Sequence, residues 1–343
     1  MKRLNSLDTL RSFAILIVLL GHSVLGYGSP AHLTPLQLGG IGVDLFFVLS
    51  GWLLGGQLFK EMASGHVDIK RFWYRRWYRT LPAYYAVLLF TVLQQLLTKD
   101  SIGNYWSYVF LLQNYTYPLD IFHVSWSLAV EEQFYLLIAP LVAGMLFLEK
   151  NQRLALLILL LFLPSVFRLL GWFEHYNETH VRIDGCVMGV LLALIRHQFN
   201  QAWQILIKAS SVLFFFSLVL FVLFFLQRWY PNEYLSEPGF LTRAFMFACW
   251  VIYANKNAMT TSRLYFPGAH YIATRSYSMY LLHPDAIAII NRITINLDFT
   301  FYLLAVFLLT LFFAEILYKA IEIPFMKLRD RVLDPTKHAL NAR

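Results

Sequence analysis

Apolar runs long enough to cross a lipid bilayer dominate this chain of 343 residues. A spanning helix needs about 20 mainly apolar residues, and inside hydrocarbon a helix satisfies all of its own backbone hydrogen bonds. Only 14% of the residues are charged, whereas a soluble domain has about 25%. We therefore predict an all-α integral membrane protein with about ten transmembrane helices. The expected spans are residues 9–27, 39–59, 81–97, 125–148, 154–172, 183–197, 205–227, 238–254, 270–291 and 299–322.

The distribution of basic residues predicts the orientation of these spans. Most Lys and Arg residues fall in loops on the N-terminal side, and only Lys99, Arg182, Arg228 and Arg292 fall on the other side. Because cytoplasmic loops are enriched in Lys and Arg, both termini are expected in the cytoplasm. Orientation explains the net charge of +8, so no nucleic-acid partner is expected. Residues 1–325 are expected to form one membrane domain, and residues 326–343 a short basic cytoplasmic tail.

Ionisable side chains inside the spans are costly, so each is a candidate site residue. Arg11 and His22 are separated by about 16.5 Å and about three helical turns, which places both on one face of the first span. Asp44, Glu131 and His283 lie in three other spans at about the depth of His22. We expect these side chains to converge, and their acid–base chemistry suits proton transfer at a hydroxyl group. His22, Asp44 and Glu131 are the catalytic candidates.

Two of the predicted spans contain further polar residues next to these candidates. Ser127 lies one turn from Glu131 on the same face, whereas Glu132 points about 100° away, so the two acids cannot both face one cavity equally. A buried hydrogen-bond network would explain Glu131 as well as catalysis does. His283 precedes Pro284, which frees the carbonyl of Tyr280 from its helical bond.

The segment KRFWYRRWYRTLP at residues 70–82 predicts a short interfacial helix that ends near Pro82. Arg71, Arg75 and Arg79 would form one basic stripe on it, and Arg11 and Arg275 could line the same inner vestibule. Lipid headgroups are one explanation of the stripe. The other is a site for a phosphate-rich cytosolic ligand, because arginine binds phosphate in a bidentate manner. No Cys or His cluster has the spacing of metal ligands, so no metal site is expected.

Together these motifs make the sequence resemble the acyltransferase family 3 membrane O-acyltransferases. The resemblance covers nearly the whole chain. It runs through LDTLRSFAILIVLLGH, GGIGVDLFFVLSG, RFWYRRWYRTLPAYY, SWSLAVEEQFYLL, RIDGCVMGVLLA and SYSMYLLHP.

The resemblance implies a bacterial inner-membrane enzyme that takes an acyl group, expected to be acetyl, from cytosolic acyl-CoA. The acceptor would be a hydroxyl of a carbohydrate or lipid-linked glycan on the outer side, and no cofactor would be bound permanently. Some relatives carry an additional SGNH-hydrolase-like domain. The chain ends too early for one, so the membrane domain or a separate partner is expected to complete the transfer.

The resemblance also implies roles for individual residues. His22 matches the family's essential histidine, and Arg11 matches its partner. Glu131 matches the acid of the SLxVE run. The remaining matches are the cytoplasmic arginines Arg75, Arg76 and Arg79, with Arg275 added as a further CoA-binding candidate. Ser127, Asp184 and His283 are expected to belong to the substrate-binding or hydrogen-bond network.

We hypothesise that His22, oriented by Asp44 or Glu131, acts as the general base on the acceptor hydroxyl. A covalent acyl-enzyme on a serine or on His22 is an open alternative. A proton-coupled transporter would explain the buried acids but not the arginine stripe, and it would be expected to show paired interrupted helices. A lipid-binding scaffold would explain the stripe but not the acids.

Overall fold

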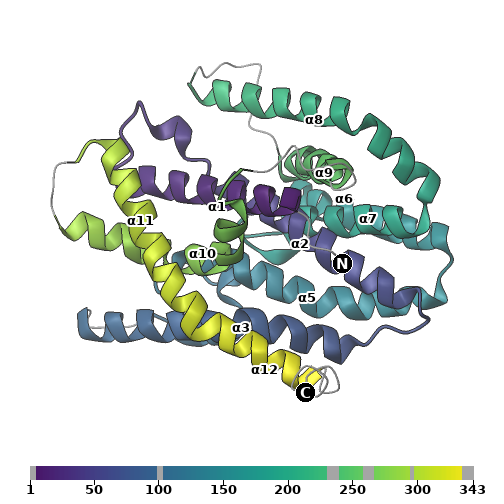
Figure 1. Ribbon diagram of the computed structural model, residues 1–343, viewed down its shortest axis with the longest axis horizontal. Coiled ribbons are helices and arrows are strands. Elements are labelled where there is room, and N and C mark those ends of the chain that lie inside the picture. Colours follow the sequence, from purple (N-terminus) through teal and green to yellow (C-terminus); the bar gives the residue numbers. More distant parts are fainter. Residues whose placement is uncertain (1–4, 99–102, 230–238, 258–265, 294–296, 334–343) are drawn as a thin grey trace.

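The computed structural model describes residues 5–98, 103–229, 239–257, 266–293 and 297–333, and in these ranges the regular elements are all helical (Figure 1). The predicted tail beyond residue 333 and the predicted inner-side residues Lys2, Arg3 and Arg263 lie outside the described ranges. The helices are α1 (Asn5–Gly26), α2 (Gly39–Met62), α3 (Ile69–Thr98), α4 (Tyr105–Val109), α5 (Trp126–Gly144), α6 (Lys150–Leu170), α7 (Asp184–Gln198), α8 (Asn200–Trp229), α9 (Phe240–Asn257), α10 (Ala269–Arg292), α11 (Phe299–Leu317) and α12 (Ile323–Leu333). A π-helical turn, Tyr318–Glu322, joins α11 to α12.

Each of the ten expected spans overlaps one of these helices within the described residues. Seven of the described helical segments are long and apolar enough to cross a bilayer: those of α1, α2, α3, α5, α6, α8 and α11–α12. The helices α7, α9 and α10 fall outside this group because α7 is short and the other two are less apolar. The protein is thus an all-α integral membrane protein.

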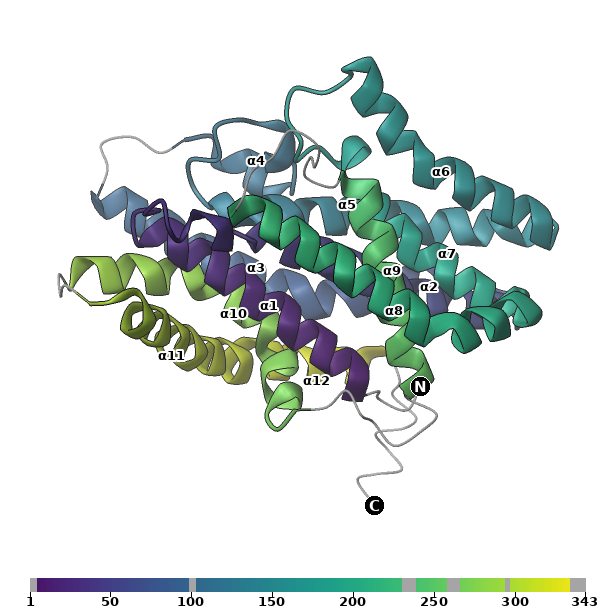
Figure 2. The same ribbon diagram turned by 90° about the horizontal axis from the view of Figure 1, so that it is seen from above.

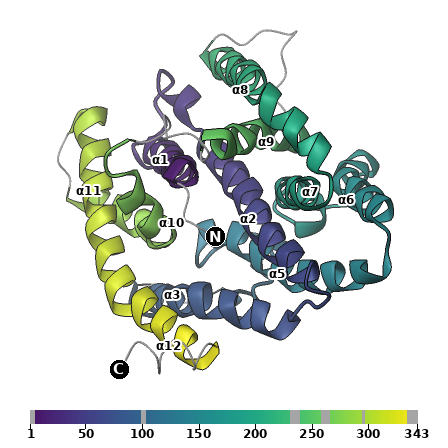
Figure 3. The same cartoon turned by 45° about the vertical axis from the view of Figure 1, so that its right-hand side comes forward.

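Helix α2 lies in the interior and packs most closely against α7. Glycines on both helices allow this approach, because a Cβ atom at Gly51 would overlap the carbonyl oxygen of Cys186 and one at Gly189 would overlap the backbone of α2. Small residues at such crossings let two backbones approach within a membrane. Figure 3 shows α2 running through the middle of the bundle.

The outer helices expose apolar side chains instead of burying them. Trp203, Ser210 and Ser217 are the buried residues of α8, whereas Val212 and Phe215 on the same helix are exposed. In a bilayer such side chains face lipid tails, so their exposure carries no hydrophobic cost. Helices α6, α8 and α11 lie at the periphery in Figures 2 and 3.

The prediction that a helix ends near Pro82 is wrong, because Pro82 lies inside the 30-residue helix α3. Proline removes one N–H donor, but neighbouring helices can stabilise the backbone around it in a membrane protein. The Tyr277 hydroxyl of α10 donates to the carbonyl of Thr80, two residues before Pro82. The basic segment is therefore the first half of a long helix.

Candidate active site

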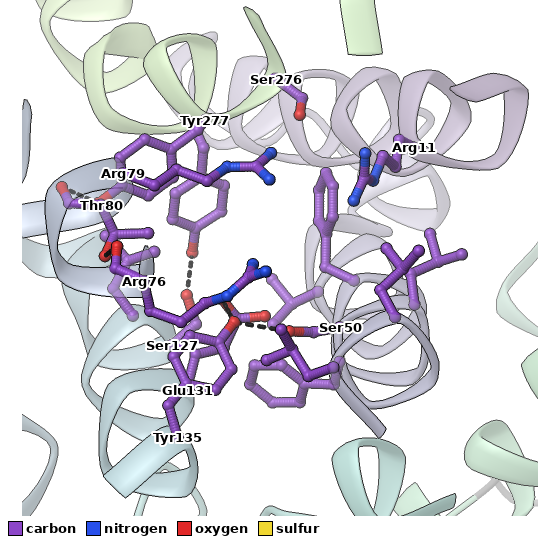
Figure 4. Close-up of a pocket in the computed structure, with 18 residues that line it drawn as sticks. Arg11, Ser50, Arg76, Arg79, Thr80, Ser127, Glu131, Tyr135, Ser276 and Tyr277 are labelled. Carbon is purple, nitrogen blue, oxygen red and sulfur yellow. Dashed lines mark hydrogen bonds between the residues drawn. The ribbon is translucent and has the colours of Figure 1, made fainter. Parts of the chain in front are cut away.

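A pocket of about 850 Å³ lies between helices α1, α2, α3, α5 and α10 (Figure 4). It is lined by Arg11, Val43, Phe46, Phe47, Leu49, Ser50, Leu53, Leu54, Arg76, Arg79, Thr80, Ser127, Leu128, Glu131, Tyr135, Ser276, Tyr277 and Tyr280. Along α2 the lining extends from Val43 to Leu54, which is about 16 Å of helix. The pocket is therefore an elongated slot with apolar and polar walls.

Three arginines make the pocket strongly basic. Arg11 comes from α1, and Arg76 and Arg79 come from α3, three residues apart on one face. Figure 4 shows the three guanidinium groups directed into the same space. Among the residues that line the pocket, Glu131 is the only carboxylate. The excess of positive charge favours an anionic ligand.

The face of α5 toward the pocket carries Ser127, Glu131 and Tyr135 at intervals of one turn, as predicted. The Tyr135 hydroxyl donates to Glu131 Oε2 over 3.0 Å and lies 2.6 Å from Ser50 Oγ on α2. Ser127 Oγ lies 2.6 Å from the hydroxyl of Tyr280 on α10. These bonds tie α5 to both neighbouring helices and fix the carboxylate of Glu131 in the pocket wall.

Glu132 faces away from the pocket, which confirms the expected separation of the two acids. Its side chain is buried and accepts a hydrogen bond from Thr80 Oγ1 at 2.6 Å. The two acids therefore have different partners: Glu131 faces the pocket, and Glu132 ties α5 to α3.

His22 and His283 form a pair beside the pocket and are not among its lining residues. Their ring centroids are 4.8 Å apart. His22 Nδ1 lies 3.0 Å from the carbonyl oxygen of Val18, and His283 Nδ1 lies 2.8 Å from the carbonyl oxygen of Tyr280. Because a carbonyl oxygen only accepts, both Nδ1 atoms carry the hydrogen, and each neutral ring has its lone pair on Nε2. The expected convergence of these two histidines is present.

Asp44 does not lie against His22, so its predicted role in orienting that ring is corrected. Its two carboxylate oxygens accept hydrogen bonds from Arg182 at 2.5 Å and from Arg243 at 2.8 Å. The Arg182 guanidinium also stacks 3.9 Å from the centroid of the Phe240 ring. A buried carboxylate is stabilised by cations, and two are available here, from Arg182 just before α7 and from Arg243 on α9. Asp44 therefore links α2 to α9 and to the segment that precedes α7.

Two further predicted site residues are engaged in ion pairs outside the pocket. Arg275 donates to Glu315 of α11 over 2.5 Å and is not among the lining residues, so its predicted place in the vestibule is corrected. Asp184 is fully buried and accepts two bonds from Arg168, at 2.7 and 2.9 Å. This second pair joins α7 to α6, which agrees with a network role.

The prediction that Arg71, Arg75 and Arg79 together form the basic face toward the ligand is also corrected. Arg76 and Arg79 line the pocket, whereas Arg71 and Arg75 are not among the lining residues. Arg76 Nη2 approaches Gln57 Oε1 at 3.4 Å. The sequence placed Arg71, Arg75 and Arg79 on one face, but the pocket selects the neighbouring face of α3. The direction of that face depends on helix packing and is not encoded by the spacing of arginines alone.

Tyr280, Thr80 and Arg182 were not among the predicted site residues. Tyr280 belongs to the SYSMYLLHP motif and lies one turn before Pro284, which could have identified it. Arg182 was assigned to an outer loop because it lies between the expected spans 154–172 and 183–197, although its side chain is only 4% exposed. A buried Asp44 required a cationic partner, and that requirement was the missed signal.

Comparisons with known proteins agree with this description. The acyltransferase domain of family 3 matches residues 4–319. The peptidoglycan O-acetyltransferase OatA of Listeria monocytogenes is 27% identical, over 95% of this chain and 56% of OatA. The predicted peptidoglycan O-acetyltransferase YrhL of Bacillus subtilis is 29% identical, over 93% of this chain and 54% of YrhL. The chain thus spans little more than half the length of these relatives. No solved structure matches it significantly.

Proposed function

Because the chain belongs to acyltransferase family 3, we propose that it is an O-acetyltransferase of the plasma membrane. The donor is acetyl-CoA on the cytoplasmic side, and the acceptor is a hydroxyl group of a cell-wall glycan on the outer side. The acceptor class follows from the relatives, which are named for peptidoglycan. No permanently bound cofactor is needed for this reaction.

The observation that carries the proposal is the basic slot beside a histidine with a free lone pair. The phosphate groups of CoA match the guanidinium groups of Arg11, Arg76 and Arg79, because arginine binds phosphate in a bidentate manner. The elongated apolar wall of α2 suits the flexible arm that carries the thioester. Tyr280 lines the slot, and His283 follows it by less than one turn of α10.

In the proposed reaction His22 is the general base. The hydrogen bond from Nδ1 to Val18 leaves Nε2 as the acceptor of the substrate proton. The hydroxyl proton moves to Nε2 while the oxygen attacks the thioester carbonyl carbon. The C–S bond then breaks, and the CoA thiolate takes the proton from His22, so the ring returns to its neutral form.

The test compares wild type with His22→Ala in matched vesicles, using radiolabelled acetyl-CoA and a cell-wall glycan extract. Loss of the base should lower the rate of label transfer by about 10²–10⁴-fold. The matched control is His66→Ala, because His66 is an exposed histidine in the loop after α2 and should be dispensable. Equal transfer by His22→Ala and wild type would overturn the role of His22. Glycan uptake without label transfer would favour a transporter.

A further inference from the structure

A second pocket, of about 620 Å³, lies between the start of α2, the end of α8 and the start of α9. It shares no lining residue with the basic slot. The cavity has a separate sign at Gly40, where an added Cβ atom would meet nothing within 4 Å. The first turn of α2 therefore has room for a ligand beside it. The pocket is lined by Gln37, Leu38, Gly40, Ile41, Phe221, Phe224, Phe225, Arg228 and Arg243.

The pocket is cationic at one end and aromatic at the other. Arg228 is the residue before the last of α8, and Arg243 lies in the first turn of α9. The ends of membrane-spanning helices lie near the lipid headgroups. Phe221 precedes Arg228 by seven residues, which places it on the same face of α8 and about 10.5 Å nearer the middle of the helix. This is the polarity of a lipid, with its phosphate at the headgroup level and its chain in the hydrocarbon.

The cationic end keeps an excess of positive charge after its own ion pairs are counted. Arg228 donates to the carbonyl of Gln37 at 2.7 Å, and this carbonyl carries no charge. Arg243 shares the carboxylate of Asp44 with Arg182, so three guanidinium groups lie near one carboxylate. None of the described residues that line this pocket is acidic. Guanidinium groups bind phosphate in a bidentate manner, so the pocket favours a phosphate ligand.

The aromatic end of the pocket adjoins the surface of α8 that faces lipid. Val222 and Leu223, which lie between the lining residues Phe221 and Phe224, are exposed. Helix α8 itself lies at the periphery of the bundle in Figures 2 and 3. Apolar surface therefore extends from the lipid-facing side of α8 to the pocket, and a lipid chain can follow it without contact with water.

The pocket lies close to the proposed catalytic base. A Cβ atom built at Gly39 would lie 3.3 Å from Cε1 of His22. The next residue, Gly40, lines the pocket and points about 100° away around the axis of α2. The first turn of α2 therefore separates the pocket from the ring of His22. The Cα atoms of a helix lie on a cylinder only about 5 Å across.

We propose that this pocket binds the phosphate and the adjoining chain of a lipid carrier to which the glycan acceptor is attached. The inference rests on the proposed function, because it specifies how the acceptor hydroxyl is brought to His22. An anionic phospholipid has the same phosphate and apolar chains, but it carries no cell-wall glycan. The short distance between the pocket and His22 therefore favours the carrier as the occupant. No bond is formed or broken in the pocket.

The first experiment measures lipid binding without any acetyl donor. Full-length wild type in phosphatidylcholine nanodiscs is titrated with a polyprenyl phosphate, which has the phosphate and the chain but no sugar. We expect it to bind at least about tenfold more tightly than the uncharged polyprenol of the same length, because charge-assisted hydrogen bonds to arginine are lost without the phosphate. Equal binding of the polyprenol would overturn the phosphate site. Equal or tighter binding of phosphatidylglycerol would overturn the assignment to a carrier.

Two substitutions locate the binding in this pocket. Gly40→Leu extends a side chain into the open space, and Arg228→Gln removes one cation. Each should raise the Kd for polyprenyl phosphate by about tenfold or more. The matched controls are Gly144→Leu, at the end of α5 where a Cβ atom also meets nothing within 4 Å, and Arg292→Gln, at the end of α10. Both controls should bind as wild type does.

A folded Gly40→Leu protein with the Kd of wild type would overturn the proposal. Because Arg228 also bonds to the chain before α2, its variant can lose stability, and in that case Gly40→Leu decides. In the acetyl-transfer assay Gly40→Leu should raise the KM for a lipid-linked glycan and leave kcat nearly unchanged. Wild type that binds polyprenyl phosphate but transfers no acetyl group would overturn the proposed function and leave the lipid site standing. Acetyl transfer by wild type without such binding would overturn the lipid site alone.

Discussion

At the residue scale, substitution of Asp44 distinguishes a structural role of this residue from a catalytic one. Its carboxylate is buried between Arg182 and Arg243. Asp44→Ala would deprive the buried Arg182 and the partly buried Arg243 of this partner, and breaking a buried ion pair typically costs about 3–5 kcal/mol. We expect a lower thermal unfolding temperature in detergent or nanodiscs. The unfolding temperature of Asp44→Asn should lie between those of wild type and Asp44→Ala, because the amide oxygen still accepts a hydrogen bond from one arginine. An Asp44→Ala protein with unchanged stability and no activity would restore the catalytic role predicted from the sequence.

The same residue shows what the sequence could predict about the site. Positions along one helix were correct: Ser127, Glu131 and Tyr135 share a face because a turn has a fixed number of residues. Depth in the membrane was also informative, since His22 and His283 do meet. The direction in which each face points around its axis depends on packing between helices. The partner of Asp44 was missed for that reason.

At the element scale, the contact between α2 and α7 offers a matched pair of glycines on one helix. A Cβ atom at Gly51 would overlap backbone atoms of α7, whereas a Cβ atom at Gly40 would meet nothing within 4 Å. Gly51→Ala should therefore push α7 away and lower the free energy of unfolding by about 1–3 kcal/mol or more. Gly40→Ala should be neutral or stabilising by up to about 1 kcal/mol, because alanine favours helix. Thermal unfolding of both variants checks this, and similar values for the two would contradict the packing.

The helices themselves were predictable because a bilayer requires long apolar segments, whatever their neighbours are. Each of the ten expected ranges overlaps a helix among the described residues. The error at Pro82 has a physical origin. In a soluble protein a proline at that position would end or bend a helix, but α3 continues for 16 residues beyond it, to Thr98. Packing against α10 supports the chain there, through Tyr277 and Thr80.

At the scale of the whole molecule, the pocket exists only when five helices are assembled, so its ligand should stabilise the entire fold. A ligand that binds only the folded state adds about 2.7 kcal/mol when its concentration is 100 times the Kd. We therefore expect CoA to raise the unfolding temperature of wild type. The double substitution of Arg76 and Arg79 by alanine should abolish that shift, because both guanidinium groups line the pocket.

Arg75→Ala supplies the contrast, since Arg75 belongs to the same helix but is not among the residues that line the pocket. From the sequence, Arg75 was expected to bind CoA together with Arg76 and Arg79. From the structure we expect Arg75→Ala to retain the stabilisation by CoA. Equal loss in Arg75→Ala and in the double variant would mean that charge on α3, and not the shape of the pocket, determines binding. Retention in Arg75→Ala alone would show that a face of one helix, turned inward by its four neighbours, makes the anion site.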